Sequence, residues 1–304
     1  MSTRITQSMV QRSLLADLNS VADRLSRTRI KLSSGKEITR PSDDPFAVSR
    51  AITLRSSLEE TRQYQRNVNE ATAWADTTEV ALARITDAVQ RARELLIQGS
   101  SDTNGPEARA AIAAEIETLI DLIKQEANTT YAGRYVFAGT ATETRPYDLG
   151  PSDAYNGNTD AVVREIGPGV AVRVNVVGSD LLGQGQAAGD DKLLHVLRDI
   201  VDHLRGGTPA DGEALRGTDL SRLDDSLGEL NRLRAVIGST TNRLETAQSR
   251  LLEIEEANRN LLSETEDADM AKTLIDFSMQ QAVYQSALQA GANIVQASLL
   301  DFLR

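Results

Sequence analysis

The chain has 304 residues, of which 40% are hydrophobic but only 4% are aromatic, so it can fold but favours thin helical rods over a thick globular core. Its net charge of −11 argues against a nucleic-acid surface spread over the whole protein, because phosphate binding needs a basic face and only the N-terminal segment is basic. There is no cysteine, no long apolar run and no apolar segment at the start, which excludes disulfides and thiolate sites and predicts neither a membrane span nor a general secretory signal.

The first forty residues predict one helix with a single apolar face. Its apolar positions alternate in steps of three and four residues, as in the seam of a coiled coil. These positions are Leu14, Leu18, Val21, Leu25, Thr28 and Leu32. Gly35 follows at a position typical of a helix C-terminus.

A rigid polar loop comes next and contains Pro41, Ser42, Asp43, Asp44 and Pro45. Asp44 is expected to cap the following helix, with Pro45 at its first position. The paired aspartates could also suggest a cation site, but their spacing before Pro45 fits capping better.

The second helix is expected to be long. The same three-four rhythm of apolar residues holds from Leu54 to Leu96, which corresponds to a helix of roughly 60 Å or more. Gly99 ends it, and a shorter helix follows with Ile112, Ile116, Leu119 and Ile123 on one face.

Around Tyr131 the spacing of the apolar residues changes from a helical to a strand pattern. Residues 135–137, 162–166 and 170–176 predict strands, with Gly167-Pro168-Gly169 as the hairpin turn between the last two. Residues 191–204 predict a helix, and the Gly- and Pro-containing residues 206–217 predict a connector without regular structure.

The C-terminal residues are again helical, with seams at 220–233 and 237–261. A last seam consists of Met270, Leu274, Phe277, Gln281, Tyr284, Leu288, Gly291, Val295, Leu299 and Phe302. Residues 1–40 carry a net charge of +5 and residues 253–304 one of −6, so opposite charges favour pairing of the two ends. Two independently solvated faces would be the alternative.

The predicted fold class is mainly α with a small β-rich domain. We expect a long antiparallel coiled-coil-like helical rod, with the N- and C-terminal helices paired and a β insertion in the middle. The expected domains are a terminal helical domain from 1–42 and 263–304, an inner helical domain from 43–132 and 216–262, and an outer β-rich domain at 133–215.

Little in the sequence points to chemistry. His195, Asp199 and His203 share one helical face, but no second helix offers an obvious further ligand, so a solvated polar face is favoured over a metal site. Gly183 and Gly185 match a dinucleotide fingerprint without its strand and helix context. We therefore expect no catalytic residue, no metal and no cofactor.

Several motifs resemble the flagellin superfamily. They are the Lys-Leu-Ser-Ser-Gly-Lys-Glu-Ile run at 31–38, the Pro-Ser-Asp-Asp-Pro loop at 41–45, Asn-Arg-Leu-Glu at 242–245, Gln-Ala-Val-Tyr-Gln at 281–285 and Ser-Leu-Leu-Asp-Phe-Leu at 298–303. The second and last of these are more similar to the branch at the junction of hook and filament than to filament flagellin. The likeness covers both terminal thirds and little of 138–215, and Arg304 extends the usual ending.

The resemblance implies a structural subunit of the flagellum, required for motility, with no catalysis. It implies a ring of copies of this chain, with hook-associated protein 1 on the hook side and flagellin on the filament side. It further implies an extracellular location after unfolded passage through the type III export apparatus, with an export chaperone on the C-terminal helix. No contact with nucleic acid and no membrane insertion is expected.

On this reading, the two terminal seams are the assembly interface, and the terminal helices are mobile in the free monomer. Residues 270–303 would form the surface for the chaperone and for other subunits. A filament flagellin is the first alternative, and a cytoplasmic coiled-coil scaffold is the second. An enzyme is the weakest interpretation.

Overall fold

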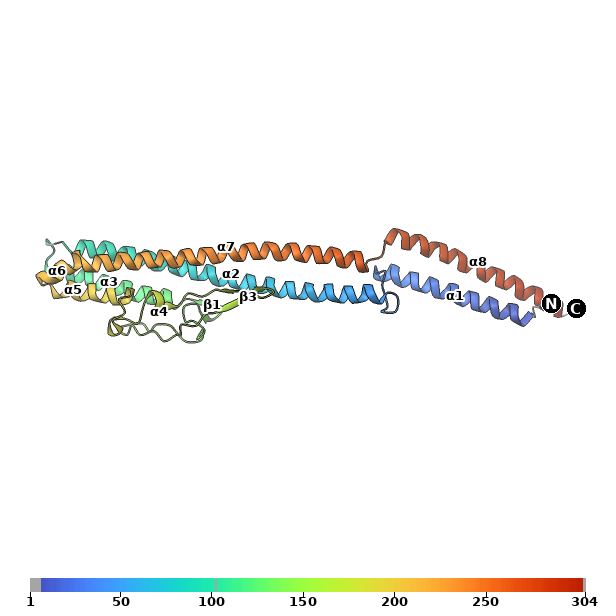
Figure 1. The fold of residues 1–304 in the computed structure, drawn as a ribbon, viewed down its shortest axis with the longest axis horizontal. Coiled ribbons are helices and arrows are strands. Elements are labelled where there is room, and N and C mark those ends of the chain that lie inside the picture. Colours follow the sequence, from blue (N-terminus) through green and yellow to red (C-terminus); the bar gives the residue numbers. More distant parts are fainter. Residues whose placement is uncertain (1–6, 102, 303–304) are drawn as a thin grey trace. The chain divides into compact units, whose positions relative to one another are not determined.

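A computed structural model describes residues 7–101 and 103–302, without the side chains of residues 7, 8, 10, 11 and 293–302 (Figure 1). Most of the chain is helical. The helices are α1 (Gln7–Ser34), α2 (Pro45–Gly99), α3 (Pro106–Ala127), α4 (Gly178–Leu181), α5 (Leu193–Gly206), α6 (Pro209–Arg216), α7 (Thr218–Glu266) and α8 (Met270–Phe302), with a 3-10 turn, η1 (Gln186–Ala188). The strands are β1 (Thr130–Tyr131), β2 (Arg134–Tyr135), β3 (Val163–Gly167) and β4 (Val170–Arg173).

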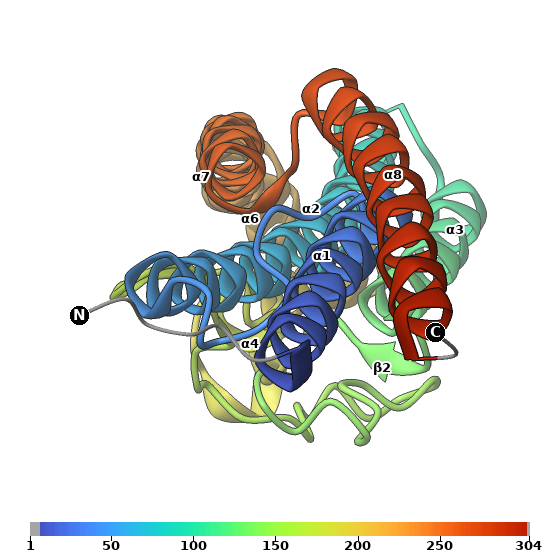
Figure 2. The same ribbon diagram turned by 90° about the vertical axis from the view of Figure 1, so that its right-hand side faces the viewer.

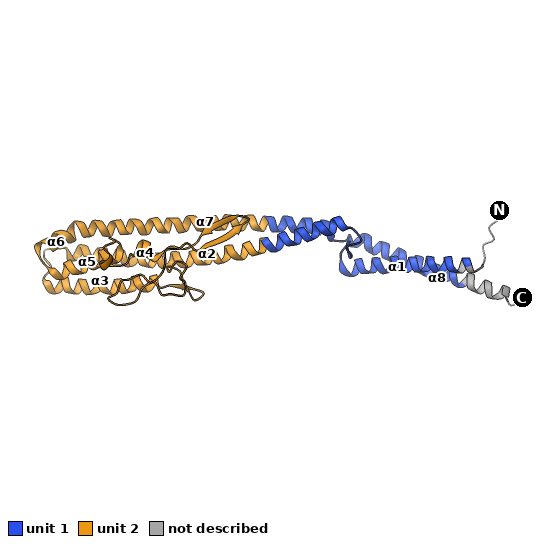
Figure 3. Ribbon diagram, turned by 60° about the horizontal axis from the view of Figure 1, so that its bottom comes forward, with its two compact units in different colours: residues 1–60, 254–304 blue, residues 61–253 orange. Residues whose placement is uncertain are grey.

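The chain divides into two compact units, and both termini belong to the same one (Figure 3). Unit 1 is formed by residues 1–60 and 254–304, and unit 2 by residues 61–253. The boundaries fall inside α2 and α7, so each of these helices contributes to both units.

In unit 1, α1 and α8 lie side by side, as the views of Figures 1 and 2 both show. Segments from the two ends of the sequence therefore form one helix pair. Gly35 ends α1 in the left-handed conformation (φ +69°), and its amide donates to the carbonyl of Lys31 at 2.9 Å. A side chain at this position would meet no neighbouring atom, so the backbone conformation alone favours glycine here.

The core of unit 2 lies where α2, α3, α5 and α7 meet. Leucine and isoleucine side chains from all four helices fill it, including the fully buried Leu82, Ile85, Ile116, Ile120, Leu197 and Leu223. Pairs of opposite charge then join α2 to α7 at the surface, with Arg93 2.6 Å from Asp224 and Arg234 2.7 Å from Glu79. The buried apolar layer supplies most of the stabilisation, because exposed ion pairs contribute little.

The β structure consists of two separate antiparallel hairpins. In the larger one, β3 pairs with β4 through Arg164 and Val172, and a register shift precedes the turn at Gly167. In the smaller one, Thr130 pairs with Tyr135, and Ala132 (φ +49°) and Gly133 (φ +78°) make the turn.

A buried ion pair fastens the middle of the chain to α3. Lys124 of α3 is fully buried, donates to the carbonyls of Gly150 (2.7 Å) and Ser152 (2.8 Å), and pairs with Asp153. Arg198 of α5 reaches the same carboxylate at 2.9 Å. A buried cation is tolerated only with such partners, so this cluster fixes the path of the loop.

These elements confirm the predicted fold class, with paired terminal helices and β hairpins in the middle of the chain. Some local predictions were wrong. Residues 209–216 are helix α6 and not an irregular connector, since Thr208 and Asp211 form a capping box. The strand expected at 135–137 stops at Tyr135, and the one expected at 170–176 stops at Arg173, because Val136 and Val174 leave the hairpins to pack in the core.

Candidate assembly surface

The face of α1 that packs on α8 is the one predicted from the sequence. Val21 and Thr28 are buried, and Leu14, Leu18, Leu25 and Leu32 are half-buried. The spacing of three and four residues brings all of these positions onto one side of a helix. The apolar stripe of α1 is therefore covered by α8.

The face of α8 that is covered differs from the predicted seam. Among the positions of α8 with described side chains, the buried or half-buried ones are Thr273, Asp276, Phe277, Gln280, Tyr284, Ala287 and Gly291. The hydroxyl of Thr28 donates to Oε1 of Gln280 at 2.8 Å, and a Cβ at Gly291 would lie 3.2 Å from Leu14, so this row faces α1. Phe277, Tyr284 and Gly291 belong to both rows, whereas small or polar residues replace the other predicted members.

Large apolar side chains of α8 are exposed instead. Of the predicted seam, Met270, Leu274 and Leu288 are exposed, at 46 to 54%. Ile275 (68%), Met279 (58%) and Val283 are exposed as well. At roughly 100° per residue these three lie on a different side from the row that faces α1.

α8 is thus apolar around most of its circumference, while α1 covers one side. No residue from Phe277 to Leu300 is charged. A helix that is apolar all round is normally buried on all sides, and large exposed apolar patches mark sites of association. Within the described ranges, no helix is long and apolar enough to span a membrane. The exposed apolar side chains of α8 suit contact with further helices.

Three further members of the predicted seam, Val295, Leu299 and Phe302, have side chains outside the described residues.

The segments that follow α1 and α7 are fastened to each other by a short β bridge. The amide of Glu37 donates to the carbonyl of Glu266 at 2.7 Å, and the amide of Ala268 donates to that of Gly35 at 2.9 Å. Lys36 lies 2.6 Å from Asp267, and this hydrogen bond raises the pKa of Lys36 and lowers that of Asp267. The opposite charges of the two ends therefore meet at this bridge.

Glu266 is the buried member of this group. Its carboxylate lies 2.8 Å from Arg55 of α2 and 3.3 Å from Lys36. A nearly buried carboxylate needs partners of this kind, and it holds the start of α2 against the end of α7 within unit 1.

Two carboxylates shape the loop before α2. Oδ1 of Asp44 accepts from the amides of Phe46 and Ala47, both at 3.0 Å, and α2 begins at Pro45. Oδ2 of Asp43 accepts from the amide of Arg40 at 2.9 Å, and this bond is the main reason that the pKa of Asp43 is lowered. Pro41 lies in the same turn. The motif acts on the backbone of the loop, as a helix cap does.

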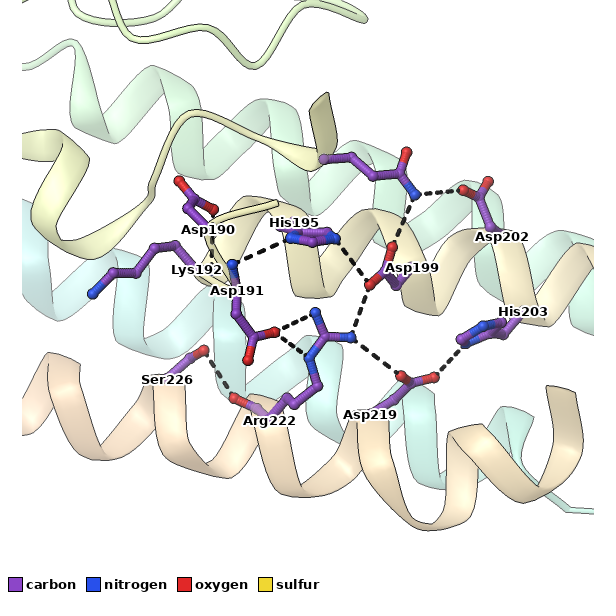
Figure 4. A network of polar contacts seen from close by, with 11 residues as sticks. Asp190, Asp191, Lys192, His195, Asp199, Asp202, His203, Asp219, Arg222 and Ser226 are labelled. Carbon is purple, nitrogen blue, oxygen red and sulfur yellow. Dashed lines mark hydrogen bonds and ion pairs between the residues drawn. The ribbon is translucent and has the colours of Figure 1, made fainter. Parts of the chain in front are cut away.

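The two histidines of the chain belong to one polar network between α5 and α7 (Figure 4). His203 Nδ1 lies 2.7 Å from the buried carboxylate of Asp219, and His195 Nε2 lies 3.3 Å from Asp199. The guanidinium of Arg222 lies between these carboxylates, 2.8 Å from Asp199, and also pairs with Asp191. The guanidinium of Arg222 therefore occupies the position between these acidic groups.

The predicted solvated face at His195, Asp199 and His203 was wrong, because α7 packs there and supplies Asp219 and Arg222. Burial acts to raise the pKa of Asp199, but hydrogen bonds from Arg222 and Gln186 outweigh it and keep that pKa low. Among the described residues, no group of three His, Cys, Asp or Glu side chains could hold a metal ion. Gly183 (φ +77°) and Gly185 (φ +82°) form a tight turn that leads into η1, which spans only Gln186–Ala188.

Comparison with known proteins gives the family of these helices. The model of the bacterial flagellin N-terminal helical region matches residues 5–142, and that of the bacterial flagellin C-terminal helical region matches residues 220–303. Flagellar hook-associated protein 3 of Escherichia coli is 28% identical to this chain, over 97% of the chain and 98% of its own length. The flagellin of Bacillus subtilis is 27% identical over 99% of the chain and 100% of its own length.

Among solved structures, a putative flagellar hook-associated protein from Vibrio parahaemolyticus is similar, with a TM-score of 0.66 at 20% identity. The match covers 74% of this chain and 100% of that one. At this level of identity it shows a shared fold.

Proposed function

The chain belongs to the flagellin family, and from this premise we propose that it is a structural subunit of the bacterial flagellum that forms the junction between hook and filament. The family supplies the class of structural flagellar proteins, and the relative named hook-associated protein 3 matches along nearly the whole chain. The observation that carries the proposal is α8, a helix with apolar residues on several sides that packs against α1 on one of them, while large apolar side chains on its other sides are exposed.

The proposed partners follow from this position. Other copies of the chain would complete a ring, hook-associated protein 1 would lie on the hook side, and flagellin would lie on the filament side. The subunit would act outside the cell after export, and an export chaperone would cover α8 before assembly. Burial of an apolar helix face at such contacts is the driving force for assembly.

The predicted seam residues divide into two groups under this proposal. Those that face α1 or α8 hold the terminal pair together, among them Leu18, Val21 and Phe277. The exposed ones, Met270, Leu274 and Leu288, would contact neighbouring subunits. Within this scheme, residues 1–42 with 263–304, residues 43–132 with 216–262, and residues 133–215 remain the proposed terminal, inner and outer domains.

Position along the flagellum tests the function. In the bacterium that encodes the chain, deletion of the gene should leave hooks without filaments and release flagellin into the medium. Antibody labels on flagella should gather at one place, where hook meets filament. Labels along the whole filament would contradict the junction role.

A filament flagellin is the second candidate, because flagellins are also among the relatives. That reading requires the purified chain to polymerise by itself into long filaments. A junction subunit should instead stop at short assemblies, since its two ends meet different partners.

A further inference from the structure

The most exposed large apolar side chain among the described residues is Phe46, in the first turn of α2, with 87% of its surface accessible. Its backbone is held in place, because Asp44 accepts hydrogen bonds from the amides of Phe46 and Ala47. The ring therefore projects from a capped, ordered helix start and not from a loose loop. A rigid, exposed aromatic residue is the usual anchor of a protein contact.

The same unit also contains a pocket. It has a volume of about 240 Å³, and its apolar wall includes Ile38, Pro41, Val48, Ala51 and Ile52. An enclosed apolar cavity of roughly 150 Å³ takes up benzene, and this open pocket with a polar rim has the volume for an aromatic ring. Arg55 and Glu266, which lie 2.8 Å apart, also belong to the lining.

The exposed ring and the pocket lie on opposite sides of α2. At roughly 100° per residue, Val48, Ala51, Ile52 and Arg55 all fall within roughly 60° of the direction opposite Phe46. Phe46 thus points away from the pocket of its own chain. A projection on one side and its complement on the other side is the arrangement that links copies head to tail.

Charge supports a second copy as the occupant. Asp44 is exposed and accepts from the amide of Phe46, whereas Asp43 is bonded to Thr39 and Arg40 of the pocket loop. The lining of the pocket includes Lys36, Arg40 and Arg55 and one carboxylate, Glu266. Lys36 and Arg55 are paired with Glu266 and Asp267, and Arg40 adds a further cation to the rim. A ring beside Asp44 therefore matches an apolar wall with Arg40 at its edge.

We propose that Phe46 of one copy inserts into the pocket between Ile38 and Ile52 of the next copy. The contact is heterologous, since two different surfaces meet, and such a contact can repeat around a closed ring. It rests on the proposed function in that a ring of identical subunits needs a contact of this type. It adds the residues through which neighbouring copies recognise each other.

Cysteine crosslinking tests the contact, because the natural chain has no cysteine. Arg50→Cys marks the side of Phe46 one turn along α2, and Thr39→Cys marks the pocket rim; both residues are exposed. Neither change removes the ring or the pocket. Full-length chains of the two kinds are mixed at high concentration and treated with a short bismaleimide.

Crosslinked dimers should form in the mixture about tenfold faster than with either variant alone. Adding Phe46→Ala to the Arg50→Cys chain should remove this excess. Adding Val80→Ala, a matched change at an exposed apolar position of α2, should preserve it. Unfolding curves of all variants should coincide, since Phe46 and Val80 make few contacts within the chain.

Three outcomes would overturn the proposal. Crosslinking of Arg50→Cys alone would indicate a symmetric contact between two Phe46 sides. An excess that survives Phe46→Ala would show that the ring is not the anchor. No excess in the mixture, together with loss of filaments in an Ile52→Glu strain, would assign the pocket to a different protein. In each of these cases, antibody labels at the hook–filament junction would still support the proposed function. Labels along the whole filament would contradict that function, even if the crosslink between copies were observed.

Discussion

The hydroxyl of Thr28 in α1 donates a hydrogen bond to Oε1 of Gln280 in α8, 2.8 Å away, across a separation of 252 residues. Both side chains lie within a seam whose other members are mainly apolar. A polar pair at one position of such a seam favours one register of the two helices, because a shift leaves the amide oxygen of Gln280 without its donor, while Thr28 can still donate to the carbonyl of Arg24 at 3.1 Å.

Replacing Thr28 by valine should weaken the terminal helix pair. The variant keeps the shape of the side chain but leaves the half-buried amide of Gln280 without its donor, at a cost of about 1 kcal/mol. Backbone amides of α8 should then exchange with solvent about fivefold faster. Adding Gln280→Leu should recover most of the loss, and a double variant as weak as the single one would contradict this role.

The exposed side of α8 should matter for assembly and not for folding. Ile275→Gln with Met279→Gln replaces two exposed apolar side chains, so the unfolding midpoint should stay the same while filaments and motility are lost. Leu149→Gln, at an exposed apolar position of a loop in unit 2, is the matched control and should swim normally. Normal filaments in the double variant would show that this side of α8 has no partner.

The buried cluster around Lys124 should make unit 2 sensitive to acid. Burial acts to raise the pKa of Asp153, but hydrogen bonds from Arg198 and Lys124 outweigh it and hold the pKa below its usual value of 3.8. The pKa of Asp153 is lower in the folded than in the unfolded chain. The ionised carboxylate therefore stabilises the fold at pH values above the unfolded pKa, and this stabilisation is lost as the pH falls through the folded pKa.

Asp153→Asn should therefore cost about 3 kcal/mol at neutral pH, since it leaves a fully buried lysine with only carbonyl partners. Urea unfolding at neutral and acidic pH would measure this, and the variant should show a smaller difference between the two. Glu143→Gln, at an exposed position, should behave like the natural protein. Equal acid sensitivity of Asp153→Asn and the natural protein would refute the assignment.

Two glycines in helices should respond to alanine in opposite directions. At Gly99 a Cβ would lie 2.6 Å from Cδ2 of the buried Leu204, so alanine should destabilise unit 2 by about 1 to 3 kcal/mol. At Gly228, inside α7, a Cβ would meet nothing within 4 Å, so alanine should stabilise by about 0.5 to 1 kcal/mol. Thermal unfolding of both variants tests the pair, and a shift of the same sign in both would contradict the packing at Gly99.

The sequence predicted those elements whose pattern is unambiguous. α1 has one apolar row, and that row is the one that packs on α8. α2 begins at Pro45, after the carboxylate that caps it. The larger hairpin turns where Gly167-Pro168-Gly169 stands. In each case the local sequence is compatible with only one structure.

Elsewhere the sequence allowed more than one solution. α8 has apolar residues on several sides, so periodicity alone could not show that Thr273 and Gln280, and not Leu274 and Gln281, face α1. The pairing of His203 with Asp219 depends on how α5 and α7 are rotated against each other, which is decided by tertiary packing. α6 did carry a signal, the capping box of Thr208 and Asp211 around Pro209, which the neighbouring glycines outweighed.

Hydrogen exchange on the full-length chain, free and in assembled flagella, tests most directly whether contacts with neighbouring subunits order the terminal helices. We predict fast exchange in residues 12–34 and 270–292 of the free chain, compared with α3 and the middle of α2. In flagella the same amides should become protected, because neighbouring subunits then cover α8. Strong protection of both segments in the free chain, unchanged on assembly, would contradict the account. It would favour a scaffold whose two terminal helices already bury each other's apolar faces.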